Sequence, residues 1–156
     1  MSLKISILGL LALLTIDWAS SQEVPSAKKS APTVGMLFIA PCSTSVSGGK
    51  ASLKIGTLCR EAQAFTGDYQ FKVSPYFFKN EKGKLSIDVA DDTLSKLASG
   101  MSVDFTGQAT TSGSGEIRRI DGKATPSGNA RGTVKLWFIA GNKELVFTTS
   151  YHFGQP

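Results

Sequence analysis

The sequence predicts an all-β protein, built as an antiparallel meander of about eight strands with one short helix. Three observations support this prediction. Apolar and polar residues alternate with the period of two that half-buried strands require. Short segments rich in Gly, Asn and Ser separate these runs. Residues typical of the start and of the end of a helix flank an amphipathic segment only near 91–99. The meander can close as a small barrel or pack as a sandwich, and the short connections between the last four strands favour the barrel.

The clearest hairpin lies near the C-terminus. Gly141-Asn142 is a two-residue loop between the β-rich runs 132–140 and 143–153, and both residues tolerate positive φ. The register that follows pairs Phe138 with Leu145, Leu136 with Phe147, and Val134 with Thr149. Apolar residues then meet on one face, and a slip by one residue would separate them, so the pattern specifies the register.

The strands upstream of this hairpin have a less regular pattern. The alternating run 101–110 predicts a strand, 111–115 a turn, and 116–124 a second strand that places Ile120 opposite Phe105. The alternation breaks at 117–120, so we expect a bulge or a sheet edge there. Asp121-Gly122 is itself a turn signal, and a turn at these residues is the main alternative to this register.

The N-terminal half of the domain predicts four further strands. They are 34–40, 51–55, 68–78 and 85–89. Composition predicts loops at 42–49 and at 80–84, which are rich in Ser and Gly or in charged residues. Pro75 removes a ladder donor, so we expect the third of these strands to be an edge or to bend near its end.

The helix predicted at 91–99 has signals at both ends. Asp91 or Asp92 can cap its N-terminus, and Gly100 suits the position just after its C-terminus. The buried stripe expected for this helix is Leu94, Leu97 and Ala98. Together these elements form one β-rich domain, 34–156, whose predicted architecture is like that of lipocalins or streptavidin. That comparison concerns architecture alone, because fold does not determine function.

The N-terminus predicts export. Lys4 precedes the apolar run 5–16, and small residues at 19–21 follow it, which is the pattern of a signal peptide, 1–21, cleaved after Ser21. The apolar run is shorter than the ~20 residues of a spanning helix, which argues against the alternative of an uncleaved anchor. A polar, flexible leader, 22–33, is expected next. The protein would then be periplasmic or extracellular.

The two cysteines, Cys42 and Cys59, both follow the signal peptide. In an exported chain they predict one disulfide, and the alternative is two buried free thiols. His152 is the sole histidine, so further metal ligands are scarce and no metal site or cofactor is expected.

The sequence contains none of the standard catalytic motifs. His152 lies near a strand end, where a surface position is the simpler interpretation. Asp104 and Asp121 could face each other as a carboxylate pair, which would suit a hydrolase, although both could equally be solvated acids paired with nearby basic residues. A carboxylate-dependent hydrolase is therefore only a distant alternative.

A set of basic residues on the outer face, with Trp137 nearby as an aromatic surface candidate, is the other candidate site. If 116–124 pairs with the strand that contains Trp137, Arg119 meets Lys135 and Lys123 meets Arg131. Like charges placed opposite each other are destabilising, and an anionic partner would relieve this. The hypothesis is a face that binds a polyanionic glycan or surface, and the alternative is a solvated face of a protein with formal charge +5. No motif for nucleic-acid binding is present.

The function that follows is an exported, non-enzymatic β-barrel that binds a small apolar or amphipathic ligand, or an anionic surface partner. The alternative is a structural or adhesive module of the cell envelope. An open apolar cavity would favour ligand binding, whereas a filled interior with an exposed apolar patch would favour the envelope module.

Overall fold

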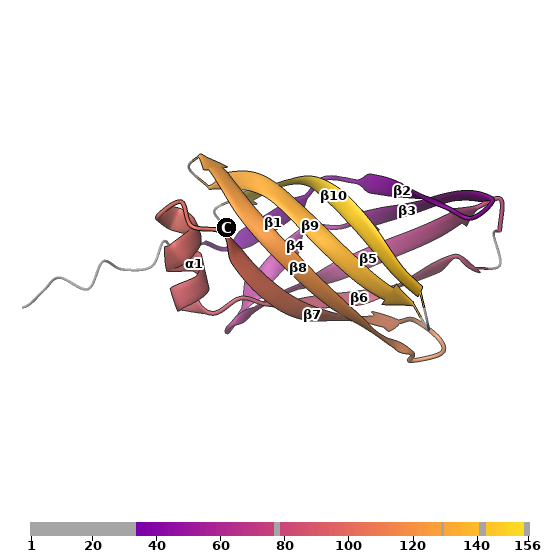
Figure 1. Cartoon of the computed structure of the whole chain (residues 1–156). Coiled ribbons are helices and arrows are strands. Elements are labelled where there is room, and N and C mark those ends of the chain that lie inside the picture. The colour runs from indigo at the N-terminus through magenta and orange to yellow at the C-terminus, as the bar shows by residue number, and fades with distance from the viewer. Residues whose placement is uncertain (1–33, 77–78, 129, 141–142, 155–156) are drawn as a thin grey trace, which may run out of the picture.

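A computed structural model describes residues 34–154, apart from 77–78, 129 and 141–142 (Figure 1). The elements in this part of the chain are β1 Met36–Ile39, β2 Cys42–Val46, β3 Gly49–Ile55, β4 Leu58–Glu61, β5 Ala64–Ser74, β6 Glu81–Asp88, α1 Asp91–Ala98, β7 Val103–Thr111, β8 Ile117–Gly128, β9 Arg131–Ala140 and β10 Lys143–Gly154. The predicted signal peptide and leader, 1–33, lie outside the described residues. Within the described part, no helix is long and apolar enough to cross a membrane.

The strands form a closed antiparallel barrel, and the all-β prediction is confirmed. Eight strands make the ring, in the order β5-β6-β7-β8-β9-β10-β1-β4, and β4 pairs back onto β5. The other two strands extend this sheet, because β3 continues along β5 and β2 pairs with β3. The barrel alternative is therefore correct, and the sandwich is not.

The strands predicted in the N-terminal half are present as β1, β3, β5 and β6. Two predicted loops were wrong. Most of 42–49 forms β2, and β6 already begins at Glu81. In both places pairing with a neighbouring strand overrides loop-like composition, as Cys42 pairs with Leu53 and Glu81 with Phe71. β5 is no edge, since it pairs with β3, β4 and β6, and Pro75 lies just beyond its last residue.

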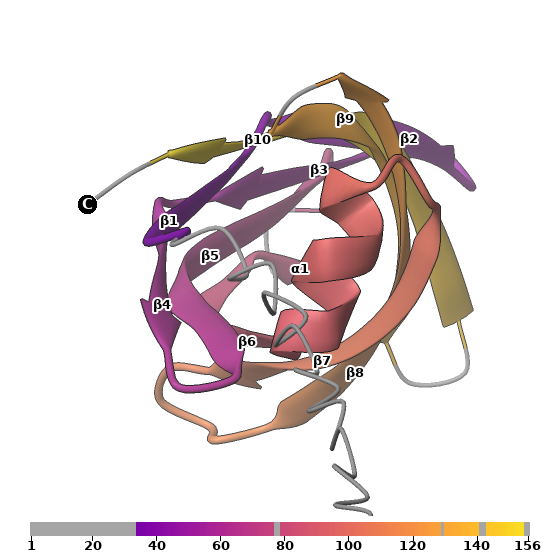
Figure 2. The same cartoon turned by 90° about the vertical axis from the view of Figure 1, so that its left-hand side faces the viewer.

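The helix α1 closes one end of the barrel (Figure 2). Ala90 is the N-cap residue and makes no side-chain cap, so the predicted Asp cap was wrong, and Asp91 and Asp92 instead lie in the first turn. Gly100, with φ of +86°, ends the helix as predicted. Backbone N–H groups of Gly100 and Met101 bond the carbonyls of Leu97 and Lys96, a Schellman motif. Leu94 and Leu97 are buried as predicted, whereas Ala98 is exposed.

The register predicted for the C-terminal hairpin is confirmed. Phe138 pairs with Leu145, Leu136 with Phe147, and Val134 with Thr149. The turn itself, 141–142, lies outside the described residues. This agreement follows from the matched apolar positions of the two strands, which bury one shared face.

The register predicted for the preceding hairpin was wrong by two residues. Phe105 pairs with Gly122, and Ile120 pairs with Gly107. The Phe105 ring lies over Gly122, where an added Cβ would be 2.1 Å from the ring, so a residue without a side chain is needed there. The bulge expected at 117–120 is also absent from the described pairing, which shifts instead between Pro126 and Gly128.

Side chains fill the centre of the barrel. The largest residues with under 2% exposure are Phe65, Phe138, Phe147, Leu58, Leu85, Ile87 and Leu136. Phe71 stacks on Phe138 with ring centroids 5.4 Å apart and meets Phe147 edge-on at 6.5 Å. A void of about 30 Å³ lies between these strands and α1, which leaves no room for an internal ligand.

Candidate functional site

A pocket of about 560 Å³ lies at the end of the barrel away from α1, and we call it the mouth pocket. Its lining comes from the ends of β2 and β5, the start of β6, the hairpin of β7 and β8, and the start of β10. The lining residues are Val46, Ser47, Phe71, Val73, Tyr76, Lys79, Asn80, Glu81, Thr111, Ser114, Glu116, Arg118, Lys143 and Leu145. This volume is typical of small-molecule sites, and barrel mouths are a common place for them.

The mouth pocket is amphipathic. Its apolar lining comes from Val46, Phe71, Val73 and Leu145, all buried or half-buried against the core. Its charged lining consists of three cations, Arg118, Lys79 and Lys143, and two carboxylates, Glu81 and Glu116. An apolar tail and a charged or polar head can therefore both be accommodated in one site.

Arg118 is the central charged residue of the mouth pocket. Its side chain is only 17% exposed, because the regular pairing of β8 turns it inward between Ile117 and Arg119. Nη1 and Nη2 bond Glu116 at 2.5 and 2.8 Å, and Nη2 also reaches Glu81 at 3.3 Å. Nε is buried and has no hydrogen-bond partner in the described part of the chain. Buried donors in native proteins are almost always satisfied, so this atom is an exception among the polar groups of the site.

Glu81 is the loosely held partner of Arg118. Its side chain is 12% exposed, yet its contacts are long, at 3.3 Å to Arg118 and 3.4 Å to the Tyr69 hydroxyl. Tyr69 also lies 3.2 Å from the hydroxyl of Thr111. Burial raises the pKa of Tyr69, the Thr111 bond lowers it, and the nearby Glu81 raises it. Tyr69 therefore stays protonated at neutral pH and can donate to Glu81.

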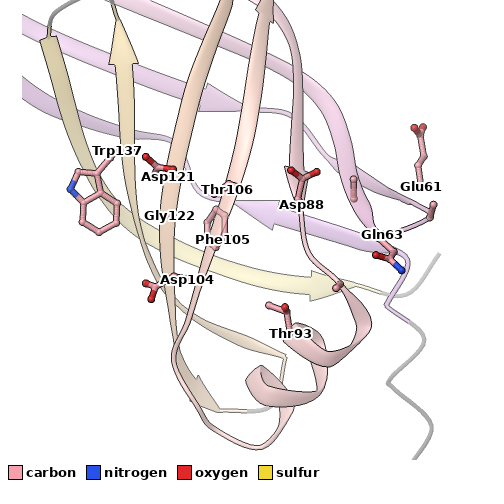
Figure 3. Close-up of a pocket in the computed structure, with 13 residues that line it drawn as sticks. Glu61, Gln63, Asp88, Thr93, Asp104, Phe105, Thr106, Asp121, Gly122 and Trp137 are labelled. Atoms are coloured by element: carbon pink, nitrogen blue, oxygen red, sulfur yellow. The ribbon is translucent and has the colours of Figure 1, made fainter.

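A second hollow, the outer groove, runs across the outside of the barrel with a volume of about 760 Å³ (Figure 3). Its outward-facing residues follow one row of cross-strand pairs, in the order Ala64, Asp88, Thr106, Asp121, Trp137. Asp104 also lines it, but the predicted facing pair of Asp104 with Asp121 was wrong. Asp104 pairs with Lys123, and Asp121 accepts a 3.0 Å bond from Arg119.

The basic residues predicted to bind anions do not form the expected stripe. Lys123 pairs directly with Lys135, Arg131 pairs with Gly128, and Arg119 pairs with Gln108 on β7. Arg119 and Lys123 are four residues apart on one strand, or roughly 13 Å. The predicted pairs were wrong because core residues set this register, with Ile120 opposite Phe138 and Gly122 opposite Leu136.

Trp137 lies on the outer face as predicted and is half-buried. The Lys135 ammonium lies over its ring, 5.0 Å from the centroid. The outer face near Trp137 therefore mixes the paired lysines 123 and 135 with the acids 104 and 121.

The predicted disulfide was wrong, because Cys42 and Cys59 are free thiols. Cys42 is on β2 and Cys59 on β4, and β3 and β5 lie between them in the sheet. Three strand spacings separate them, roughly 14 Å, which no disulfide spans. Cys42 packs against the core, and burial raises its pKa to about 11, whereas Cys59 is exposed.

His152 is exposed and stacks on Phe38 with centroids 4.7 Å apart. In the described part of the chain no three His, Cys, Asp or Glu residues are grouped so as to hold a metal ion.

No protein-family model matches the chain, no curated protein matches its sequence, and no solved structure matches its fold. Sequence reasoning missed Arg118 with Glu81 and Tyr69 as an internal cluster. The available signal was the broken alternation at 117–120, which reflects an inward-facing arginine rather than a bulge.

Proposed function

We propose that this protein is an exported, non-enzymatic β-barrel that binds a small amphipathic ligand in the mouth pocket, with a carboxylate head at Arg118 and an apolar tail. The observation that carries this proposal is Arg118 itself: a nearly buried guanidinium with an unpartnered Nε in the wall of an amphipathic pocket. Export rests on the N-terminal sequence pattern.

The chemistry of Arg118 favours a carboxylate. Glu116 occupies the two terminal nitrogens, so the edge formed by Nε and Nη2 is left with Glu81 alone, at 3.3 Å. A guanidinium edge of this kind binds carboxylates through two parallel hydrogen bonds. The pocket lining has one more cation than carboxylates, which adds long-range attraction for an anion.

The other candidate functions have less support. Among the described residues, the exposed large apolar side chains are Tyr76 after β5, Met101 after α1 and Ile117 at the start of β8, and an adhesive module would need several such residues in one patch. A polyanion site would depend on Lys123 and Lys135, and Lys123 also pairs with an acid, Asp104.

Isothermal titration of dodecanoate into protein purified from the full-length chain tests the proposal. We expect saturable binding of one ligand per chain. Lys143→Glu, at the exposed rim, should weaken it by about tenfold, which corresponds to 1.4 kcal/mol. Lys123→Glu makes the same charge change on the outer face and should leave binding unchanged. Absence of saturable binding, or equal losses in the two variants, would overturn the proposal.

A further inference from the structure

The barrel is split at the end that holds the mouth pocket. β1 pairs with β10 as far as Ile39 and Tyr151, and the Ala40 N–H then bonds the Ser150 carbonyl at 3.0 Å. The next residue, Pro41, has no N–H to continue the ladder. Beyond it β2 pairs only with β3, and no backbone hydrogen bond joins β2 to β10 in the described residues. The two strands nevertheless lie close together over part of their length, and we call the unpaired boundary between β2 and residues 143–148 of β10 the seam.

The seam is one border of the mouth pocket. Val46 and Ser47 line the pocket from β2 and the turn after it, and Lys143 and Leu145 line it from β10. Figures 1 and 2 show β2 and the start of β10 spreading apart toward this end of the barrel.

The inner side of the seam is mostly apolar. Along β2 the inward, half-buried positions are Cys42, Thr44 and Val46, and Cys42 and Val46 pack against the core, whereas Ser43 and Ser45 are exposed. On β10, Leu145 also packs against the core. Hydrocarbon lying between the two strands would contact these side chains and be removed from water.

The path inward is blocked. Phe71 stacks on Phe138 at 5.4 Å and meets Phe147 edge-on, and these rings fill the barrel below the pocket. The void beyond them holds only about 30 Å³. A tail longer than the mouth pocket cannot extend toward α1, so it has to leave along the seam or through the open end.

We infer that the seam holds the hydrocarbon chain of a linear amphiphile, so that the ligand class is long-chain carboxylates rather than compact ring-shaped amphiphiles. This inference rests on the proposed function, which places the carboxylate head at Arg118. The chain then runs past Phe71 and Val73 and leaves between Val46 and Leu145. Contact with the hydrocarbon chain does not require β2 and β10 to move or to pair with each other, because apolar side chains of both strands already face the pocket.

Photo-crosslinking with hexadecanoate that carries a diazirine at its methyl end tests this inference. After irradiation and digestion, mass spectrometry should find the label on residues 44–46 of β2 or 145–147 of β10. A label on Phe138 or on α1 would place the tail inside the barrel and overturn the inference. A label confined to the open rim, at Tyr76 or Ser114, would also overturn it. Dodecanoate titration separates the two claims, since failure of that titration removes the proposed function itself.

A matched pair of variants gives a second measurement. Val46→Asp places a charge on the inner side of the seam, and Ser45→Asp places the same charge on its exposed side. Val46→Asp should weaken hexadecanoate by about tenfold, the contribution of roughly two buried methylenes, and octanoate far less. Ser45→Asp should change neither affinity. Equal losses for octanoate and hexadecanoate in the Val46 variant would contradict a chain that lies along the seam.

Discussion

The two ends of the barrel are made by the same strands but differ in how completely the strands pair and pack. At the α1 end, β1 bridges β10 and β4, the ring of hydrogen bonds is complete, and Leu94 and Leu97 bury themselves beneath the helix. At the mouth, β2 leaves β10, and Arg118 and Glu81 occupy inward positions. The best-packed end and the mouth pocket thus lie at opposite ends of one axis, and the mouth pocket lies where the closure of the barrel is least complete.

Truncation of an apolar side chain should show the largest difference between the two ends of the barrel. Phe65 is 0% exposed in the closed half of the barrel, and Phe65→Ala should lower the free energy of unfolding by about 3–5 kcal/mol. Leu145→Ala, at the half-buried mouth, should cost well under half of that, because solvent already reaches the site. Urea denaturation of both variants measures the difference. Equal losses would show that the two ends are packed alike.

Removal of the Glu81 charge should increase the affinity of the mouth pocket for a carboxylate. Glu81→Gln takes away the charge that competes for the Nε–Nη2 edge of Arg118, so dodecanoate should bind about tenfold more tightly, or 1.4 kcal/mol. The control is Asp68→Asn, an exposed carboxylate that is paired with Lys84 on the outside of the barrel. An affinity gain no larger than that of the control would show that Glu81 does not occupy the place of the ligand head.

The smallest expected effect concerns the two thiols at alkaline pH. Burial raises the pKa of Cys42 from 9.0 to about 11. At a pH between these two values the thiol is deprotonated in the unfolded state but still protonated in the folded state. The contribution of Cys42 to the free energy of unfolding is therefore fully present below pH 9 and is lost as the pH rises toward 11. This pKa shift corresponds to about 2.7 kcal/mol in the free energy of unfolding. Because Cys42 is only partly buried, solvent screening reduces the expected loss to about 1 kcal/mol.

Urea denaturation at pH 8.5 and 10.5, with a reductant present, measures this loss. Cys42→Ser should lose about 1 kcal/mol less stability than the parent protein across this range. Cys59→Ser, at the exposed cysteine, should behave like the parent. The raised pKa values of Tyr69 and Tyr151 contribute equally to all three proteins and therefore cancel. The same slope for all three would exclude a buried Cys42 thiol.

The sequence predicted those features that depend on neighbours along the chain. The register of β9 and β10 followed from alternating apolar residues around a short turn, and the end of α1 followed from Gly100. Burial of one shared face and the need for positive φ are local requirements, so the residues themselves reveal them.

Tertiary structure alone decided the rest. Whether Cys42 could reach Cys59 depended on two strands inserted between them, and the register of β8 depended on Phe105 lying over Gly122. The mouth pocket likewise gathers Arg118, Glu81 and Val46 from three separate strands around a seam that begins at Pro41. The alternation of residues in the sequence indicates which face of a strand is buried. Only the closed barrel determines which strands pair and where a pairing is missing.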